Sequence, residues 1–342
     1  MSPAAGPRTE PLLERLLHVD PHTGALLDAT VGELGRFLRA GDLLVVNDGA
    51  TLPGMLRGVT ADGEAIEARL AQSLEDGRFQ ALLFGAGDAR QRTEDRRPPP
   101  QLAVGAQVRF GPGLEAVIAE VSSLSSRLVV LVFSAQGAAL WEAIYRNGRP
   151  VQYAYVPAPL ALWDVQTRYA SRPICAEMPS AGRPLAWGLL LSLVRRGVRL
   201  ASLSHAAGLS STGDPALDAR LPLAERFEIP EATVRAVLDT RSRGGRVVAV
   251  GTTVTRALEG AAVLGRGTLL AGRGVTELIL GAHHAPAVVD GLLTGVHEPS
   301  ESHFELLSAF AGRDVLRRAH AHAEARGYLT HEFGDSMLLL AA

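Results

Sequence analysis

The stretch RVVAVGTTVTRALEGA at residues 246–261 gives the strongest indication of the fold. Residues 246–250 have the composition of a buried strand, which runs through Gly251-Thr252-Thr253 into a helical pattern. A strand that leads directly into a helix is typical of α/β proteins. The turn also gathers free backbone N–H groups and two hydroxyls at a helix N-terminus, which suits a carboxylate or a phosphate. An ordinary threonine cap is the alternative interpretation.

Strands and helices alternate in the same way elsewhere in the chain. Residues 12–46 show a short strand, a helix and a second, apolar strand that ends in Asn47-Asp48. After residue 134, helical patterns alternate with strands again. Polar residues in loops that follow strands often carry function. Asn47 and Asp48 are therefore candidates for a binding site.

Residues between about 58 and 134 follow a different pattern. Apolar and polar residues alternate in several short segments separated by Gly/Asp, Pro-rich and Ser-rich breaks, which favours a small antiparallel barrel or sandwich. We therefore predict an α/β main domain, residues 10–57 and 136–342, interrupted by an inserted small antiparallel β-barrel domain at residues 58–135. Residues 1–9 are small and Pro-rich, and we expect them to be disordered.

The composition excludes several classes of chemistry. The 342 residues include 34 Lys+Arg against 36 Asp+Glu, and all of the basic residues in that count are arginine. Without lysine the chain cannot form a lysine Schiff base, anchor pyridoxal phosphate or supply the lysine of a P-loop. A net charge of -2 gives no general footprint for nucleic acid, so such a partner must bind a local patch.

Cysteine usage and hydropathy indicate the compartment. Cys175 is the single cysteine, which excludes an intrachain disulfide and a cysteine metal cluster. No apolar run approaches the roughly 20 residues that span a bilayer, and the N-terminus lacks a signal-peptide pattern. We therefore expect a cytoplasmic protein with no membrane partner. The histidine pairs lack the spacing of metal ligands, so we predict no metal site.

Two stretches near the C-terminus carry polar residues in loops. In LLTGVHEPSES (292–302), His297 lies beside Glu298 and Glu301 and could act as a general base, although a surface histidine has the same sequence signature. In HEFGDSM (331–337), Asp335 precedes a last apolar strand. The G-x-S-x-G, G-x-G-x-x-G and H-E-x-x-H motifs of common enzyme classes are absent.

Sequence blocks in a fixed order give the chain a resemblance to one family. The blocks are HVDPHTGAL, GDLLVVND with Pro53, Gln166-Thr167 with Tyr169, Pro179-Ser180-Ala181-Gly182, AVGTT with Arg256 and Leu258-Glu259, Thr294 with His297 and Pro299, SAFAG, and Gly334-Asp335 before Met337. The chain resembles the S-adenosylmethionine:tRNA ribosyltransferase-isomerases of queuosine biosynthesis over most of its length. The layout of that family, an α/β domain interrupted by a small β-barrel, agrees with the pattern above.

The resemblance implies a reaction on tRNA. The ribosyl part of S-adenosylmethionine moves onto the aminomethyl group of a deazaguanine base and rearranges to an epoxycyclopentane, and adenine and methionine are released. The carbon next to the sulfonium is acidic, so a base must take its proton. Carboxylates or aromatic faces stabilise the cation, while backbone donors or arginine bind the methionine carboxylate.

The resemblance and the positions of the polar residues together predict three sets of site residues. The candidates for the base or the cation partner are His297, Asp335 and Glu225. The co-substrate S-adenosylmethionine is expected to contact Asn47, Asp48, Gly251, Thr252, Thr253 and Arg256. The acceptor is expected to contact Tyr155, Gln166, Tyr169, Ser180 and Gly182.

Several residues that are usual in the family are replaced in this chain. The usual N-D-T-R and P-A-R blocks correspond to Gly49-Ala50 and Gly54-Met55, and Pro184 stands where a histidine is usual. Losing bidentate arginines changes which polar groups a pocket can satisfy. Two alternatives therefore stay open: an enzyme that uses S-adenosylmethionine with a small-molecule acceptor, or a non-catalytic S-adenosylmethionine-binding protein. The expected partner is tRNA or that small molecule, and we expect a monomer or a weak homo-oligomer.

Overall fold

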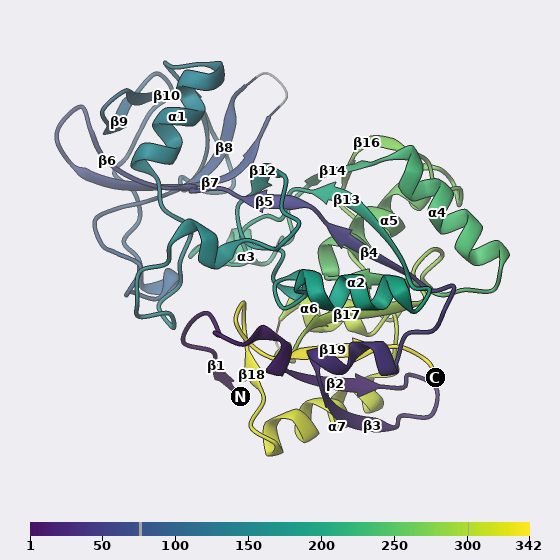
Figure 1. Cartoon of the computed structure of the whole chain (residues 1–342). Helices are drawn as coiled ribbons and strands as arrows, with labels where there is room; N and C mark the ends of the chain where they lie inside the picture. Colours follow the sequence, from purple (N-terminus) through teal and green to yellow (C-terminus); the bar gives the residue numbers. More distant parts are fainter. Residues whose placement is uncertain (75–76, 300) are drawn as a thin grey trace.

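The structure is a computed structural model that describes residues 1–74, 77–299 and 301–342. A nine-stranded sheet is covered by helices, and a closed six-stranded barrel lies beside it (Figure 1). The predicted fold class, an α/β domain interrupted by a small antiparallel β-barrel, is confirmed.

The large sheet has the strand order β16-β14-β13-β4-β15-β17-β19-β2-β3. Its central strands run parallel to one another: β13 (Arg199–His205), β4 (Leu43–Asn47), β15 (Val247–Val250) and β17 (Gly291–Gly295). Next to β13, the sheet continues antiparallel with β14 (Glu225–Ile229) and β16 (Gly272–Thr276). Next to β17, it is completed by β19 (Ser336–Leu339), β2 (Arg15–Val19) and β3 (Leu26–Thr30).

Strands β4 and β15 are buried at every position, which explains the apolar runs LLVV and VVAV in their sequences. Because side chains alternate along a strand, Leu43 and Val45 of β4 face one helical layer, and Leu44 and Val46 face the other. The first layer contains α4 (Glu231–Ser242), α5 (Thr252–Leu264), α6 (Ser302–Leu307) and α7 (Arg313–Ala325). The second layer contains α2 (Trp187–Arg195) and the 3-10 helix η2 (Val31–Arg36).

The barrel closes in the order β10-β11-β8-β7-β6-β9. Its strands are β6 (Met55–Thr60), β7 (Ala65–Ser73), β8 (Phe79–Phe84), β9 (Gln107–Gly111), β10 (Leu114–Val121) and β11 (Leu128–Phe133). They extend from residue 55 to residue 133, where the sequence predicted a domain at 58–135. Alternating apolar side chains fill the interior, among them Phe79, Phe110 and Phe133.

Helix α1 (Gly137–Asn147) packs on the barrel (Figure 1), although the sequence assigned residues from 136 onward to the main domain. Leu140, Ala143 and Ile144 of this helix belong to the same apolar core as the barrel strands. The physical reason is burial, because α1 removes from water the apolar side chains that a bare barrel would expose.

The N-terminal segment differs from the expected disorder at residues 1–9. Ser2–Pro3 forms strand β1, which pairs in parallel with β18 (Leu329–Thr330). The amino group of Met1 lies 2.9 Å from Oε1 of Glu298. The partners lie about three hundred residues away in the sequence, so composition alone could not reveal them.

Short elements complete the chain. Strand β5 (Gly49–Thr51) pairs in parallel with β12 (Arg172–Cys175). The remaining elements are helix α3 (Pro215–Asp218) and the 3-10 helices η1 (Pro11–Leu13), η3 (Thr93–Asp95), η4 (Leu162–Val165) and η5 (Ser180–Gly182). Among the helices in the described ranges, none combines the length and the apolarity needed to cross a membrane.

Candidate active site

The carboxyl ends of the four parallel strands meet at one edge of the sheet. Asn47 ends β4, His205 ends β13, Gly251 directly follows β15, and Thr294 lies near the end of β17. Ligands of open α/β sheets commonly bind outside this edge. The segment between β17 and α6 contributes His297 to the same region.

Asn47 connects three of these segments. Its Oδ1 accepts hydrogen bonds from the backbone N–H groups of Gly49 and His205, both at 3.0 Å. Its Nδ2 donates to the carbonyl oxygen of His205 at 3.0 Å and to Oγ1 of Thr253 at 3.4 Å. The amide is buried and engaged on both atoms, so Asn47 shapes the site through the backbone of its neighbours.

Helix α5 begins without a side-chain cap. Its N-cap residue, Gly251, has a φ of 92°, a left-handed value that favours glycine. No side chain in the described ranges accepts a hydrogen bond from the first turn at this N-cap, and Thr252 and Thr253 are partly exposed. The helix N-terminus therefore offers backbone N–H groups and the positive end of the helix dipole to an anion.

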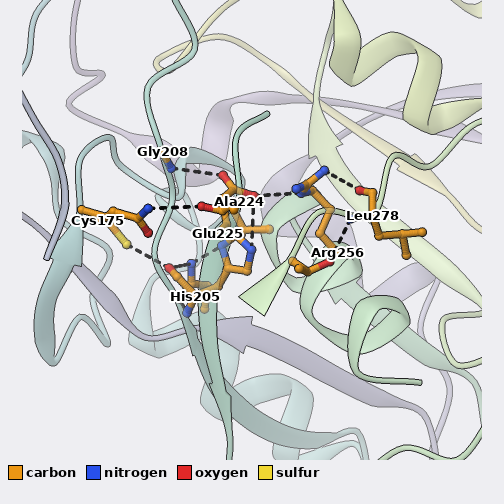
Figure 2. A network of polar contacts seen from close by, with 11 residues as sticks. Cys175, His205, Gly208, Ala224, Glu225, Arg256 and Leu278 are labelled. Atoms are coloured by element: carbon orange, nitrogen blue, oxygen red, sulfur yellow. Dashed lines mark hydrogen bonds and ion pairs between the residues drawn. The ribbon is translucent and has the colours of Figure 1, made fainter. Parts of the chain in front are cut away.

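Glu225 and Arg256 form a buried ion pair beside this edge (Figure 2). Nε of Arg256 donates to Oε2 of Glu225 at 2.8 Å, and Nη1 donates to the carbonyl oxygen of Leu278 at 2.6 Å. The N–H of Gly208 donates to Oε1 of Glu225 at 3.2 Å. Within the part of the chain that the structure describes, Nη2 of Arg256 is buried without a hydrogen-bond partner. One guanidinium nitrogen is thus left to bind an additional acceptor.

His205 is a candidate that the sequence reasoning missed. Its imidazole is fully buried, and its Nε2 lies 3.4 Å from Oε2 of Glu225 (Figure 2). Burial lowers the pKa of His205 to about 4, Glu225 opposes the shift and Arg256 adds to it, so the ring is neutral at pH 7. The available signal was its position directly after the predicted strand RLASLS. The thiol of Cys175 donates to the His205 carbonyl at 3.2 Å, and burial raises its pKa to about 12.

His297 lies in the segment between β17 and α6. Its Nε2 lies 2.9 Å from Oγ1 of Thr294, and its Nδ1 lies 3.3 Å from Oε2 of Glu301. The ring stacks on that of His303, with the centroids 5.0 Å apart. The side chain is 18 % exposed, which leaves it accessible to a ligand at the edge of the sheet.

Two other predicted residues are held in hydrogen bonds within the protein. Oδ1 of Asp48 accepts a hydrogen bond from the hydroxyl of Ser204 at 2.6 Å. The side-chain amide of Gln166 pairs with the backbone of Thr51, accepting from its N–H and donating to its carbonyl oxygen, both at 3.0 Å. These contacts fix the segments that surround the edge of the sheet.

Asp335 has the contacts of a structural carboxylate. It is buried, and its two oxygens accept hydrogen bonds from the backbone N–H groups of Arg15 at 3.0 Å and Leu329 at 2.8 Å. Nη2 of Arg8 lies 2.8 Å from Oδ1. Asp335 thereby connects three segments near the start of β19.

The residues predicted for the acceptor form two groups. Ser180 and Gly182 lie in η5, where a Cβ at position 182 would lie 2.0 Å from the Tyr169 hydroxyl, so this close approach requires glycine. The ring of Tyr155 stacks between those of Tyr153 and His331, with centroid distances of 5.9 and 4.4 Å.

Comparison with known proteins decides the family. A family model described as "Queuosine biosynthesis protein" matches residues 3–339. The chain belongs to this family. A relative from Parvibaculum lavamentivorans is 33% identical over 96% of this chain and 92% of its own length. A relative from Thiobacillus denitrificans is 35% identical over 95% of this chain and 90% of its own length, and both are named S-adenosylmethionine:tRNA ribosyltransferase-isomerase.

A solved structure agrees with this membership in the queuosine biosynthesis family. The crystal structure of an S-adenosylmethionine tRNA ribosyltransferase from Thermotoga maritima aligns with a TM-score of 0.53 and 25% identity. The alignment covers 99% of this chain and 96% of that one. The resemblance found in the sequence blocks is therefore confirmed.

This member of the queuosine biosynthesis family has two cavities in the described ranges, and the segment 206–212 lines the first of them. One is lined by Gln72 and Gln80 of the barrel and by Glu225, and so lies between the barrel and the sheet domain. The other is lined by Tyr153, Glu177 and Glu332 among others. Burial raises the pKa of Glu177 to about 7, and the nearby carboxylate of Glu332 adds to the increase.

Proposed function

We propose that this chain is an S-adenosylmethionine:tRNA ribosyltransferase-isomerase of queuosine biosynthesis. It transfers the ribosyl part of S-adenosylmethionine to an aminomethyl-deazaguanine base in tRNA, isomerises it to the epoxycyclopentane of epoxyqueuosine, and releases adenine and methionine. The observation that carries the proposal is the full-length likeness to relatives of this name, at 33–35% identity in the two compared above. This likeness favours tRNA over a small-molecule acceptor and over a non-catalytic role.

The geometry supports an anion site for the methionine carboxylate of the co-substrate. The uncapped start of α5 supplies backbone N–H groups, and Nη2 of Arg256 is a buried donor without a hydrogen-bond partner in the described ranges. Charge-assisted hydrogen bonds of this kind are about twice as strong as neutral ones. Glu225 pairs with Arg256, so that the anion subsite and a carboxylate lie side by side. S-adenosylmethionine presents that combination, a carboxylate together with a cationic sulfonium.

The reaction also needs a base for the proton next to the sulfonium. His297 is our candidate, because it is accessible, lies at the same edge of the sheet and has partners on both ring nitrogens. His205 is fully buried, and we assign it to shaping the Glu225–Arg256 pair. We propose Tyr155 and the η5 residues Ser180 and Gly182 for the acceptor side.

A single assay tests the proposed function. The purified protein is incubated with S-adenosylmethionine and with tRNA that carries the precursor base, and the digested nucleosides are analysed by mass spectrometry. We expect epoxyqueuosine together with equimolar adenine and methionine, and no product from tRNA that lacks the precursor base. Adenine release that depends on small metabolites and not on tRNA would support the small-molecule acceptor. Binding of S-adenosylmethionine without any turnover would support the non-catalytic alternative.

A further inference from the structure

His297 lies between a hydroxyl and a carboxylate. Thr294, buried in β17, places its Oγ1 2.9 Å from Nε2 of the imidazole. Glu301, the N-cap residue of α6, places Oε2 3.3 Å from Nδ1. Thr294 and Glu301 lie at the two ends of the loop that carries His297, so the imidazole is held from both sides. Hydroxyl, imidazole and carboxylate in this order are the arrangement that orients a general base in many hydrolases.

The hydrogen bonds determine which ring nitrogen carries the proton. Burial alone would raise the pKa of Glu301. The hydrogen bond and the charge of His297 lower the pKa, and His331 and the backbone N–H of Glu298 lower it further. Together they exceed the effect of burial and leave the pKa below its usual value. Glu301 is therefore ionised at neutral pH and can only accept a hydrogen bond. In the neutral ring, Nδ1 must then donate to Glu301, which leaves the lone pair on Nε2 to accept from the Thr294 hydroxyl.

We propose that Glu301 is a positioning residue that fixes His297 in the Nδ1–H tautomer, and that Nε2 of His297 is the proton acceptor of the reaction. This inference rests on the proposed function. Nε2 takes the proton from the carbon next to the sulfonium, and the electron pair of that C–H bond stays on the carbon. The imidazolium that forms keeps its hydrogen bond to the ionised Glu301. Thr294 orients the ring until substrate replaces its hydroxyl at Nε2.

The surrounding charged groups leave Glu301 as the anionic partner of the ring. The stacked His303 is neutral at pH 7, because its pKa is lowered to about 4. Burial is the main cause; His297 and Arg256 also lower the pKa, while Glu301 raises it. The carboxylate of Glu298 is engaged elsewhere, with the Met1 amine and with His320, both at 2.9 Å. His331 and Glu332, in the loop before β19, also interact with Glu301. Burial raises the pKa of Glu332, whose carboxylate accepts a hydrogen bond from the Tyr155 hydroxyl.

A purely structural role for Glu301 is the competing explanation. Its Oε2 also accepts the backbone N–H of Glu298 at 3.2 Å, which stabilises the turn before α6. A glutamine can keep that bond through its amide oxygen, but it cannot hold an imidazolium by charge. The test must therefore measure the state of the ring and the pH dependence of turnover, in addition to stability.

The first experiment compares turnover in Glu301→Gln, Glu301→Asp and His297→Ala. We expect kcat to fall on the order of 10- to 100-fold in Glu301→Gln, with KM for both substrates changed less than about 3-fold, and by 100-fold or more in His297→Ala. The acidic limb of the kcat profile moves to lower pH in Glu301→Gln, because the imidazolium loses its anionic partner. Glu301→Asp should recover part of kcat. The matched control is Glu305→Gln in the same helix, whose carboxylate pairs with Arg313 at 2.9 Å on the surface.

The second experiment needs no activity. In protein with 15N-labelled histidine, the ring of His297 is assigned by its loss in His297→Asn and its tautomer is read from the two nitrogen shifts. We expect unprotonated Nε2 in the wild type and a shift toward the Nε2–H tautomer in Glu301→Gln. A wild-type Nε2–H tautomer, or an unchanged kcat profile in Glu301→Gln, overturns the proposal. If wild-type protein makes no epoxyqueuosine, the proposed function fails, while the tautomer is still measured.

Discussion

Carboxylates that are buried or half-buried in this protein differ in what balances their charge. Glu225 is paired with Arg256, whereas Asp335 accepts two backbone N–H groups and lies near Arg8. Glu177 accepts hydrogen bonds from the hydroxyls of Tyr153 and Ser210 and from the Ser210 N–H. Since a buried charge costs free energy unless it is paired, the effect of each substitution depends on these partners.

We expect Asp335→Asn to lower stability more than turnover. The sequence suggested a base here, but both oxygens accept hydrogen bonds from backbone N–H groups, those of Arg15 and Leu329. In an asparagine, an NH2 group replaces one carboxylate oxygen, so a donor then faces a backbone N–H. We expect this to lower the unfolding free energy by about 1–3 kcal/mol, measured in urea titrations. Asp314→Asn, at a carboxylate that is 92% exposed, is the control. An unchanged unfolding curve with a hundredfold lower kcat would make Asp335 a catalytic candidate again.

The raised pKa of Glu177 predicts a pH dependence of stability. Its pKa is about 7 in the folded protein against an ordinary value of 4.5. Between these values the unfolded chain loses a proton that the folded protein keeps, so the unfolding free energy falls as pH rises and stays reduced above pH 7. We expect this decrease in wild-type protein and a flatter profile in Glu177→Gln, measured by thermal unfolding from pH 4.5 to 8. Parallel profiles for the two proteins would contradict the assignment.

At the scale of elements, the turn from β15 into α5 brings the largest number of predicted residues together. Its strand lies between β4 and β17, so the turn is flanked by Asn47 on one side and by the Thr294–His297 segment on the other. The 3-10 helix η5 approaches from a third side, because a Cβ at Gly251 would lie 3.5 Å from that of Ala181. The left-handed backbone conformation of Gly251 thus sets the direction in which α5 begins.

Gly251→Ala tests the importance of this turn. A φ of 92° is strained for alanine, and we expect a loss of about 1–2 kcal/mol in unfolding free energy together with weaker binding of S-adenosylmethionine in calorimetric titrations. Gly312→Ala is a matched control, since Gly312 is also a helix N-cap but has a φ of -59° and nothing within 4 Å of an added Cβ. Equal stability and equal affinity in the two variants would show that the turn tolerates a side chain.

At the scale of the whole molecule, two bodies with different architecture meet beside the site. The outer face of the barrel packs through Met55, Leu82 and Leu128 against segments of the main domain. The cavity at this junction includes Glu225, the acidic partner of Arg256. The cavity therefore connects the outer face of the barrel with the Glu225–Arg256 pair of the sheet domain.

The charge of the molecule predicts how tRNA binding responds to salt. A net charge of -2 means that phosphate contacts must come from local groups of arginine. Each released phosphate counterion contributes about 0.7–0.9 to the slope of log affinity against log salt concentration. We expect KM for tRNA to rise steeply when the salt concentration is raised from roughly 50 to 200 mM, because bound counterions are then released less favourably. KM for S-adenosylmethionine should change little. A salt-independent KM for tRNA would argue against recognition of the nucleic-acid backbone.

The sequence by itself determined the class of the segments with a clear hydrophobic pattern. The apolar runs at 43–46 and 247–250 are long enough, and uninterrupted enough, to require burial on both faces, which is the property of parallel strands between two helical layers. The alternation of apolar and polar residues over 58–134 argued against burial on both faces of a strand. It indicated strands with one face in a small core. The polar residues at strand ends, Asn47 and Gly251 to Thr253, followed from the same patterns because they depend on neighbours in the sequence.

Only the tertiary structure decided which of these residues meet. Asn47 contacts His205 and Thr253, which lie 158 and 206 positions away, because β4 is inserted between β13 and β15 in the sheet. No local pattern encodes that order of strands. The same holds for the N-terminal segment, which is ordered by pairing with β18, and for Asp335, whose hydrogen bonds bind it to distant backbone. Hydrophobic periodicity depends on a few adjacent side chains, whereas a site depends on long-range contacts that form only when the whole sheet is assembled.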